Sequence, residues 1–216
     1  MQPLGGKPLI AWTIEAAQHA PALGRVIVST DDHEIAQVCR DWGADVPFLR
    51  PATLAQDDSD HVSVVMHALQ WLAENQAIHP EYVMLLQPTS PFRSAEDISA
   101  AVALARQHEA SAVVSVSEAR CHPYLAKRIT ADGSLADFVT TGLAYLRRQD
   151  LPPAYTLNGA IYLNRPESLA RDRTFLPPGT IPYIMPPERS LDIDSPWDFY
   201  LADLILRDRT HAQDDR

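Results

Sequence analysis

Two aspartates separated by one residue, Asp192 and Asp194, have the types and spacing expected of a metal-binding pair. In extended backbone, side chains two positions apart lie on the same side of the chain, so both carboxylates would face one ligand. Mg²⁺ binds through one or two such carboxylates together with water and phosphate oxygens. The pair therefore predicts a magnesium site that also handles phosphate. The alternative is that Asp194 only caps the helix that we expect to begin at Ser195-Pro196.

A loop with two prolines, Gln87-Pro88-Thr89-Ser90-Pro91, follows the most apolar segment of the chain. Proline restricts the backbone, so the amide of Gln87 and the hydroxyls of the loop can be presented to a ligand at low entropic cost. The alternative is a rigid turn in which Ser90 or Ser94 caps the next helix.

Two further positions are candidates for ligand binding. Asn158-Gly159 precedes the apolar residues 160–163 and is either a hairpin turn or a place where backbone approaches a ligand closely. Arg50 follows a predicted strand and is suited either to a phosphate group or to an ion pair with the acidic run at 57–60.

The elements around these residues alternate between short apolar strands and amphipathic helices, which predicts an α/β fold with a doubly wound, mostly parallel sheet. Ligands bind beyond the carboxyl ends of strands in such sheets, where the candidates above are found. The expected strands span residues 25–30, 44–49, 82–86, 112–116, 158–163 and 181–185, and the expected helices span residues 8–20, 33–42, 61–75, 95–107 and 196–208.

Length and composition favour a single domain covering residues 1–216, with residues 121–153 forming an arm outside the main sheet. The net charge of −10 and the absence of a basic cluster argue against a nucleic-acid partner. No apolar run is long enough to span a membrane. The two cysteines, Cys39 and Cys121, fit neither a disulfide framework nor a zinc site, so we expect a cytoplasmic protein.

Taken in order along the chain, several segments resemble the acylneuraminate cytidylyltransferases, or CMP-sialic acid synthetases. The resemblance extends from about residue 2 to residue 206 and is most specific in the segments at 87–93 and 158–162. The segments are Ser29-Thr30-Asp31, Arg50-Pro51, Gln87-Pro88-Thr89-Ser90-Pro91-Phe92-Arg93, Asn158-Gly159-Ala160-Ile161-Tyr162 and Leu191-Asp192-Ile193-Asp194.

The resemblance implies a Rossmann-like homodimeric enzyme that transfers CMP from CTP to the anomeric hydroxyl of a nonulosonic, sialic-acid-type sugar and releases pyrophosphate. Mg²⁺ would be its cofactor, and the arm at 121–153 would mediate dimerisation. The implied roles are metal binding and catalysis for Asp192 and Asp194, cytidine binding for Arg50 and Ser59, and sugar binding for Gln87, Ser90, Asn158 and Tyr162.

The chain departs from the family pattern at its start. Members of the family open with a strand and a loop similar to A-R-G-G-S-K-G, and Pro3-Leu4-Gly5-Gly6-Lys7 corresponds to sequence that follows this loop. We therefore expect an N-terminally shortened domain that binds the triphosphate weakly. A catalytically silent homologue that dimerises or binds a sugar or nucleotide is the alternative, and a CMP-Kdo-type nucleotidyltransferase is another.

The identity of the sugar is open between neuraminic, legionaminic and pseudaminic types. Thr156 stands where some members of the family carry an arginine, and together with His61 it is compatible with a legionaminic- or pseudaminic-type sugar.

Overall fold

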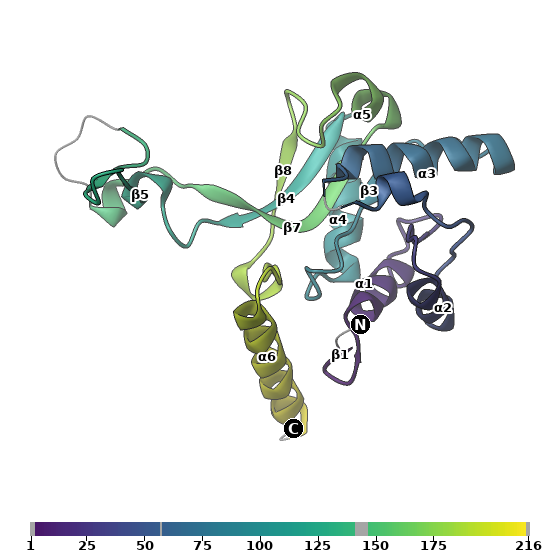
Figure 1. The fold of residues 1–216 in the computed structure, drawn as a ribbon, viewed down its shortest axis with the longest axis horizontal. Helices are drawn as coiled ribbons and strands as arrows, with labels where there is room; N and C mark the ends of the chain where they lie inside the picture. The colour runs from purple at the N-terminus through teal and green to yellow at the C-terminus, as the bar shows by residue number, and fades with distance from the viewer. Residues whose placement is uncertain (1–2, 57, 141–146, 215–216) are drawn as a thin grey trace.

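The computed structural model describes residues 3–56, 58–140 and 147–214. Helices cover both faces of a central sheet, a two-stranded arm extends from it, and the last helix lies below it (Figure 1). The helices are α1 (Leu9–Gln18), α2 (His33–Asp41), α3 (His61–Gln76), α4 (Ala95–Gln107), α5 (Pro166–Asp172) and α6 (Pro196–Asp214). The strands are β1 (Pro3–Leu4), β2 (Lys7–Pro8), β3 (Val83–Leu85), β4 (Ala112–Glu118), β5 (Lys127–Ile129), β6 (Leu135–Asp137), β7 (Tyr155–Asn164) and β8 (Ile181–Ile184).

The central sheet has the strand order β3-β7-β4-β8. Strand β7 runs antiparallel to β3 and β4, whereas β4 and β8 are parallel, so three of the four strands share one direction. The predicted α/β fold is confirmed, and the sheet is mixed. Strand β7 is reversed because the chain reaches it by returning from the arm and not through a helical crossover.

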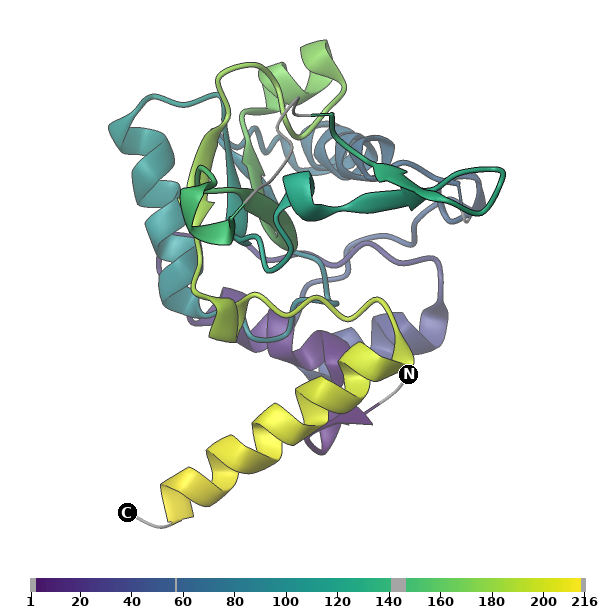
Figure 2. The same ribbon diagram turned by 90° about the vertical axis from the view of Figure 1, so that its left-hand side faces the viewer.

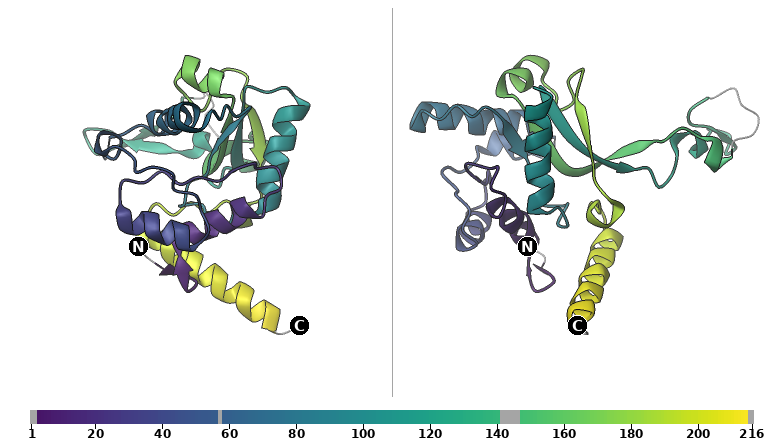
Figure 3. Two further views of the ribbon diagram at one scale, coloured as in Figure 1. Left: turned by 90° about the vertical axis from the view of Figure 1, so that its right-hand side faces the viewer. Right: turned by 180° about the vertical axis from the view of Figure 1, so that it is seen from behind.

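Alternate residues of β3 pack on opposite faces of the sheet. Tyr82, Met84 and Leu86 contact a core formed with α1 and α4, while Val83 and Leu85 contact a second core with α3 and α5. Successive side chains of a strand point in opposite directions, and both directions here meet apolar partners. The two views in Figure 3 show α4 and α3 on the two sides of the sheet. Burial on both faces explains why this segment is continuously apolar.

The segments expected as strands at 25–30 and 44–49 do not form ladders. A single parallel bridge joins Ile27 to Asp45, and the N–H of Val28 donates to the carbonyl of Asp45 at 2.8 Å. A strand is defined by repeated backbone hydrogen bonds with a neighbour. Within the described part of the chain, β3 pairs only with β7. These two segments are therefore extended but lie outside the ladders of the sheet.

The arm predicted at 121–153 leaves the sheet as a continuation of β4 and β7. It carries the antiparallel pair β5–β6 and two short 3-10 turns, at Pro123–Leu125 and Arg148–Asp150. Figure 2 views the arm end-on, with α6 crossing beneath the sheet. Residues 141–146 of the predicted arm lie outside the described residues. No helix in the described ranges combines the length and apolar character needed to cross a bilayer.

Strand β7 contains an irregularity opposite Ser115 of β4. Val116 pairs with Leu157 and Val114 pairs with Tyr162, so residues 158–161 of β7 face the single residue Ser115. The Ser115 hydroxyl donates to Asn158 Oδ1 at 2.6 Å and accepts from the N–H of Ile161 at 2.7 Å. The buried Ser115 hydroxyl thus replaces part of the missing ladder hydrogen bonds, and Asn158 Oδ1 accepts another from the N–H of Ala160.

We predict that Ser115→Ala lowers the free energy of unfolding by about 1–3 kcal/mol, because the buried N–H of Ile161 and the buried amide oxygen of Asn158 would each lose the hydrogen bond made with Ser115. Urea denaturation monitored by circular dichroism measures this change. Ser99→Ala is the matched control, since the Ser99 hydroxyl only bonds back to the carbonyl of Ala95 within α4. Equal stability of the two variants would contradict a role for Ser115 in holding the irregularity.

Candidate functional site

The irregularity in β7 directs Gly159 toward the loop that carries Asp192. Gly159 has φ 70°, and a Cβ atom built on it would lie 2.5 Å from Asp192 Oδ2 and 3.0 Å from Gln87 Oε1. Real Cβ atoms do not make contacts that short, so only glycine fits. Of the two interpretations of Asn158-Gly159, the structure supports close approach: β7, the Gln87 loop and the Asp192 loop converge here.

Hydrogen bonds to the backbone of β7 hold the Gln87 loop in place. The hydroxyl of Ser90, which is fully buried, donates to the carbonyl of Asn158 at 3.1 Å. Arg93 donates to the carbonyl of Ala160 at 2.6 Å and to that of Gln87 at 3.2 and 3.3 Å. Ser94, and not Ser90, caps α4 through a capping box with Asp97. The loop is therefore a rigid turn that also positions the Gln87 amide.

Arg93 is a buried cation, only 3% exposed. Besides the two backbone carbonyls, its guanidinium donates to the Thr13 hydroxyl at 2.6 Å. Burial lowers the pKa of Arg93 to about 10, and the negative charges of Asp97 and Asp192 oppose that shift. The side chain thus remains protonated at neutral pH and places a positive charge beneath the site.

The loop that carries Asp192 is fixed on both sides of that residue. The Asn158 Nδ2 group donates to the Ser190 hydroxyl at 3.0 Å, and the N–H of Ile193 donates to the carbonyl of Thr89 at 2.9 Å. At the preceding residue of the chain, Arg189 makes two hydrogen bonds of 2.8 Å to Asp97, which is fully buried. Burial alone would raise the pKa of Asp97, but hydrogen bonds from Arg189, Ser94 and Tyr183 lower it below its ordinary value.

The carboxylates of Asp192 and Asp194 remain available to a ligand. Asp192 Oδ1 is buried and has no hydrogen-bond partner in the described part of the chain. Helix α6 begins with a reciprocal pair of hydrogen bonds between Ser195 and Asp198, so the Asp194 carboxylate is not its cap. A buried carboxylate oxygen without a donor is unfavourable unless a cation satisfies it.

The donor set at this position suits a hard cation that keeps some of its own water. No group of three or more His, Cys, Asp or Glu side chains gathers within the described ranges. Zinc sites generally use three or four such protein ligands. Mg²⁺ accepts one or two carboxylates and fills its remaining positions with water and phosphate oxygens, so the residues present fit Mg²⁺.

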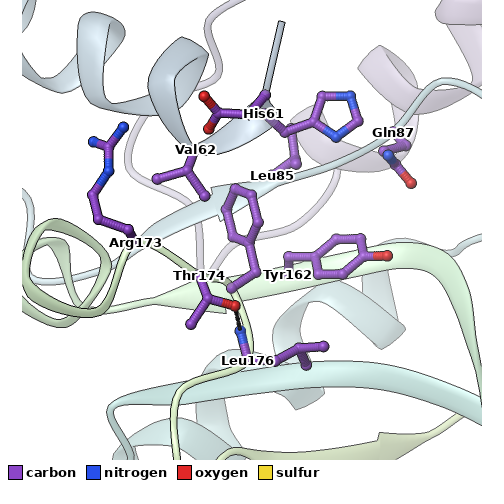
Figure 4. A pocket seen from close by; sticks show the side chains of 10 residues that line it. His61, Val62, Leu85, Gln87, Tyr162, Arg173, Thr174 and Leu176 are labelled. Atoms are coloured by element: carbon purple, nitrogen blue, oxygen red, sulfur yellow. Dashed lines mark hydrogen bonds between the residues drawn. The ribbon is translucent and has the colours of Figure 1, made fainter. Parts of the chain in front are cut away.

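A cavity of about 480 Å³ opens beside Gln87 (Figure 4). This volume lies within the range of roughly 300–1,000 Å³ that is usual for small-molecule sites. The cavity is bounded by the start of α3, by β3 and β7, and by the segment after α5. Its lining residues are Asp60, His61, Val62, Leu85, Gln87, Tyr162, Arg173, Thr174, Phe175 and Leu176.

Tyr162 connects this cavity to the aspartate loop. Its ring packs against Phe175 with centroids 5.5 Å apart, and Figure 4 shows its hydroxyl directed toward the Gln87 side. Burial raises the pKa of Tyr162, and the negative charge of Asp192 raises it further. The phenol is therefore protonated at neutral pH and available as a hydrogen-bond donor.

Arg50 and Ser59 occupy neighbouring loops and do not line the cavity. Arg50 Nη2 lies 3.4 Å from Asp31 Oδ1, so the ion pair that Arg50 makes is with Asp31 and not with the acidic run at 57–60. Asp57 of that run lies outside the described residues. Arg50 Nε is buried and has no partner among the described residues. Ser59 directly precedes Asp60, the cap of α3, and its hydroxyl accepts from the N–H of Gln56 at 2.9 Å.

The structure divides the sequence-predicted site residues into groups. Gln87 and Tyr162 line the cavity and lie close to Asp192, whereas Ser90 and Asn158 are buried behind it in contacts within the protein. Direct sugar contact by these last two residues stays a prediction. Sequence reasoning missed Arg93 and the segment 173–176. An arginine within the otherwise neutral loop at 87–93 was a usable signal, but nothing local marks residues 173–176.

Known proteins resemble this chain over most of its length. The family described as Cytidylyltransferase matches residues 1–181. The chain is 35% identical over 206 residues to CMP-N,N'-diacetyllegionaminic acid synthase of Legionella pneumophila, covering 94% of this chain and 87% of that protein. It is also 35% identical over 198 residues to N-acylneuraminate cytidylyltransferase of Streptococcus agalactiae, covering 91% of this chain but 46% of that protein, so the chain spans about half the streptococcal relative.

The fold has a counterpart among solved structures. CMP:2-keto-3-deoxy-manno-octonic acid synthetase, solved in complex with CTP, superposes with a TM-score of 0.69 at 15% identity and covers 96% of this chain and 91% of that one. At this identity the likeness shows the fold alone. The extent of the family match and the identity to the Legionella protein carry the assignment: the chain belongs to the cytidylyltransferase family.

Proposed function

We propose that this protein transfers CMP from CTP to the anomeric hydroxyl of a nonulosonic, sialic-acid-type sugar. The observation that carries the proposal is the convergence of Gln87, Gly159 and Asp192 beside a sugar-sized cavity. The relatives named above are a CMP-N,N'-diacetyllegionaminic acid synthase and an N-acylneuraminate cytidylyltransferase. In the reaction, the anomeric oxygen bonds to the α-phosphorus of CTP, the bond from that phosphorus to the oxygen bridging the α- and β-phosphates breaks, pyrophosphate leaves with the bridging oxygen, and the hydroxyl proton passes to water.

Transfer of this kind depends mainly on positioning and on neutralising phosphate charge. Asp192 and Asp194 would hold Mg²⁺, which supplies that neutralisation when bound. Within the described ranges Asp192 Oδ1 has no hydrogen-bond partner, and Asp198 caps α6 in place of Asp194; both observations support this role. The anchored loops on either side keep Asp192 from turning away from the reacting groups.

The two substrates would occupy different sides of the aspartate loop. The Nε of Arg50, buried and without a partner in the part of the chain that the structure describes, supports a contact with the nucleotide, and we place Ser59 with it at the cytidine side. Gln87 and Tyr162, in the cavity, would contact the sugar directly. Ser90 and Asn158 would support the sugar site from behind, through the contacts that fix Gln87 and Gly159.

The arm supports the further proposal of a homodimer. Ile129, Leu135 and Phe138 are 76%, 73% and 68% exposed, although apolar side chains of this size normally avoid water when they lie together. They sit on or beside β5 and β6, away from the central sheet (Figure 1). A second copy of the chain would cover them.

The central test is formation of CMP-sugar and pyrophosphate from CTP, Mg²⁺ and a nonulosonic acid, measured by ion-exchange chromatography and a phosphate-release assay. CTP is expected to be used at least about tenfold better than UTP, ATP or GTP, the preference provided by one base-specific hydrogen bond. Product formed only with an eight-carbon Kdo-type acid would favour the alternative acceptor, and no product with any acid would contradict the proposal.

For the metal, Asp194→Ala is expected to reduce the rate of CMP transfer by about 10²–10³-fold, the usual effect of losing one electrostatic stabiliser of the transition state. Initial rates across a Mg²⁺ titration measure it. Asp203→Ala is the control, because Asp203 forms only a surface ion pair with Arg207 on α6. Near-normal turnover by Asp194→Ala in Mg²⁺ would remove Asp194 from the metal site.

For the dimer, Phe138→Glu is expected to convert the protein from a dimer to a monomer, since a charge would be buried in the proposed interface. Light scattering coupled to size-exclusion chromatography gives the mass of each form. Leu204→Glu changes an apolar residue of α6 that is 42% exposed and is expected to leave the mass unchanged. A wild-type chain that elutes with the mass of a monomer would refute the dimer.

A further inference from the structure

The end of the cavity remote from Asp192 carries a charged pair joined through a serine. Arg173 Nη2 donates to the Ser63 hydroxyl at 2.9 Å, and this hydroxyl donates to Asp60 Oδ2 at 2.6 Å. Asp60 also caps α3 by accepting from the N–H of Ser63 at 2.8 Å. The hydrogen bonds from Ser63 lower the pKa of Asp60, and the charge of Arg173 contributes to the same direction. A fixed cation and a fixed anion therefore stand together at this end.

The position of Arg173 is set by the backbone as well as by Ser63. Arg173 has φ 52° and ends α5 in the left-handed conformation, which is uncommon for a residue other than glycine. The turn directs residues 174–176 along the cavity wall. Figure 4 shows Arg173 on one side of the cavity and Gln87 on the other, with Val62 and Leu85 between them.

The middle of the cavity is largely apolar. Val62, Leu85, Phe175 and Leu176 contribute most of its walls between the two polar ends, and His61, Tyr162 and Thr174 complete them. A chain of hydroxyl groups lying there would exchange water for aliphatic and aromatic carbon, and each unpaired hydroxyl would weaken binding. A methyl or deoxygenated group would instead gain from burial.

The charged pair matches one functional group better than others. Arginine has five N–H donors, of which Ser63 takes one within the described residues, and each Asp60 oxygen can accept more than one hydrogen bond. A secondary amide offers both a carbonyl acceptor and an N–H donor. A carboxylate would gain from Arg173 but be repelled by Asp60, so this end is not suited to the acid group of the sugar.

We propose that Arg173, together with Asp60, is a specificity-determining residue that binds a second acylamino group on the exocyclic side of the sugar. The substrate class is then a nonulosonic acid with two acylamino groups and a partly deoxygenated chain, in preference to one with a single acylamino group and a fully hydroxylated chain. The inference rests on the proposed function, because it takes the cavity to be the sugar site. Beyond the proposed function, the inference specifies which substituent of the sugar the remote end binds.

The test compares two acids, N,N'-diacetyllegionaminic acid and N-acetylneuraminic acid, with the wild type and with Arg173→Met. Equilibrium affinity is measured by calorimetry, and KM and kcat are measured in the transfer assay. The wild type is expected to bind the diacetylated acid more tightly. Arg173→Met is expected to weaken that binding roughly 10- to 100-fold, the effect of losing a hydrogen bond from a charged donor, while changing the affinity for N-acetylneuraminic acid by less than about threefold. The loss should appear in KM and not in kcat.

Arg171→Met is the matched control, because Arg171 lies two residues away, pairs with Asp172 on the surface and does not line the cavity. Equal weakening of both acids by Arg173→Met would show that the guanidinium only supports the fold. Tighter binding of N-acetylneuraminic acid by the wild type would overturn the inferred substrate class and leave the proposed function standing. Binding of neither acid would overturn the assignment of the cavity, whereas absence of CMP-sugar with every acid tested is the separate failure of the proposed function.

Discussion

The site depends on a local break in one strand pairing, where residues 158–161 of β7 face Ser115 alone. A regular ladder would keep Gly159 within the plane of the sheet, hydrogen-bonded to β4. The extra residues instead move it toward Asp192 and Gln87. Two side chains compensate for the lost ladder, since the Ser115 hydroxyl and the Asn158 amide satisfy each other and the neighbouring backbone N–H groups. The irregularity is thus a built feature, of the kind that redirects residues at functional sites.

The charges beneath the site follow from the same convergence. Arg93 reaches the carbonyls of Gln87 and Ala160 only because the Gln87 loop lies against β7, and its burial would be unfavourable without acceptors on several sides. The carboxylates of Asp97 and Asp192 provide the compensating negative charge. Asp97 is itself held by Arg189 at the start of the aspartate loop. Loop position and charge balance are therefore coupled, so a change in one loop alters the field felt by the others.

The sequence predicted those parts of the fold that depend on local pattern. The helix expected at 95–107 has the bounds of α4, and its cap at Ser94 was one of the alternatives considered. The extended segments at 25–30 and 44–49 were also recognisable, but their participation in a ladder was not, because pairing depends on a neighbour that local sequence does not specify. Site residues marked by local sequence could be predicted, and those placed by distant partners could not. Gln87, Asp192 and Asp194 follow apolar strands or precede a helix, where position alone suggests a ligand. Arg173 acquires its place from Ser63, 110 residues away in the chain.

The two ends of the cavity differ in charge, and this difference orients whatever binds there. The end beside Gln87 lies near Asp192, whose buried Oδ1 has no hydrogen-bond partner among the described residues, so a ligand at this end gains from an accompanying cation. The remote end holds Arg173 and Asp60 together, nearly neutral as a pair, and recognises a dipole without needing a counter-ion. Between them, Val62 and Leu85 belong to the cores of α3 and β3, so their spacing is set by packing of the sheet. Because a packed core does not stretch, the distance between the two ends is fixed by the fold. A ligand must therefore match both ends at a separation that the ligand itself does not control.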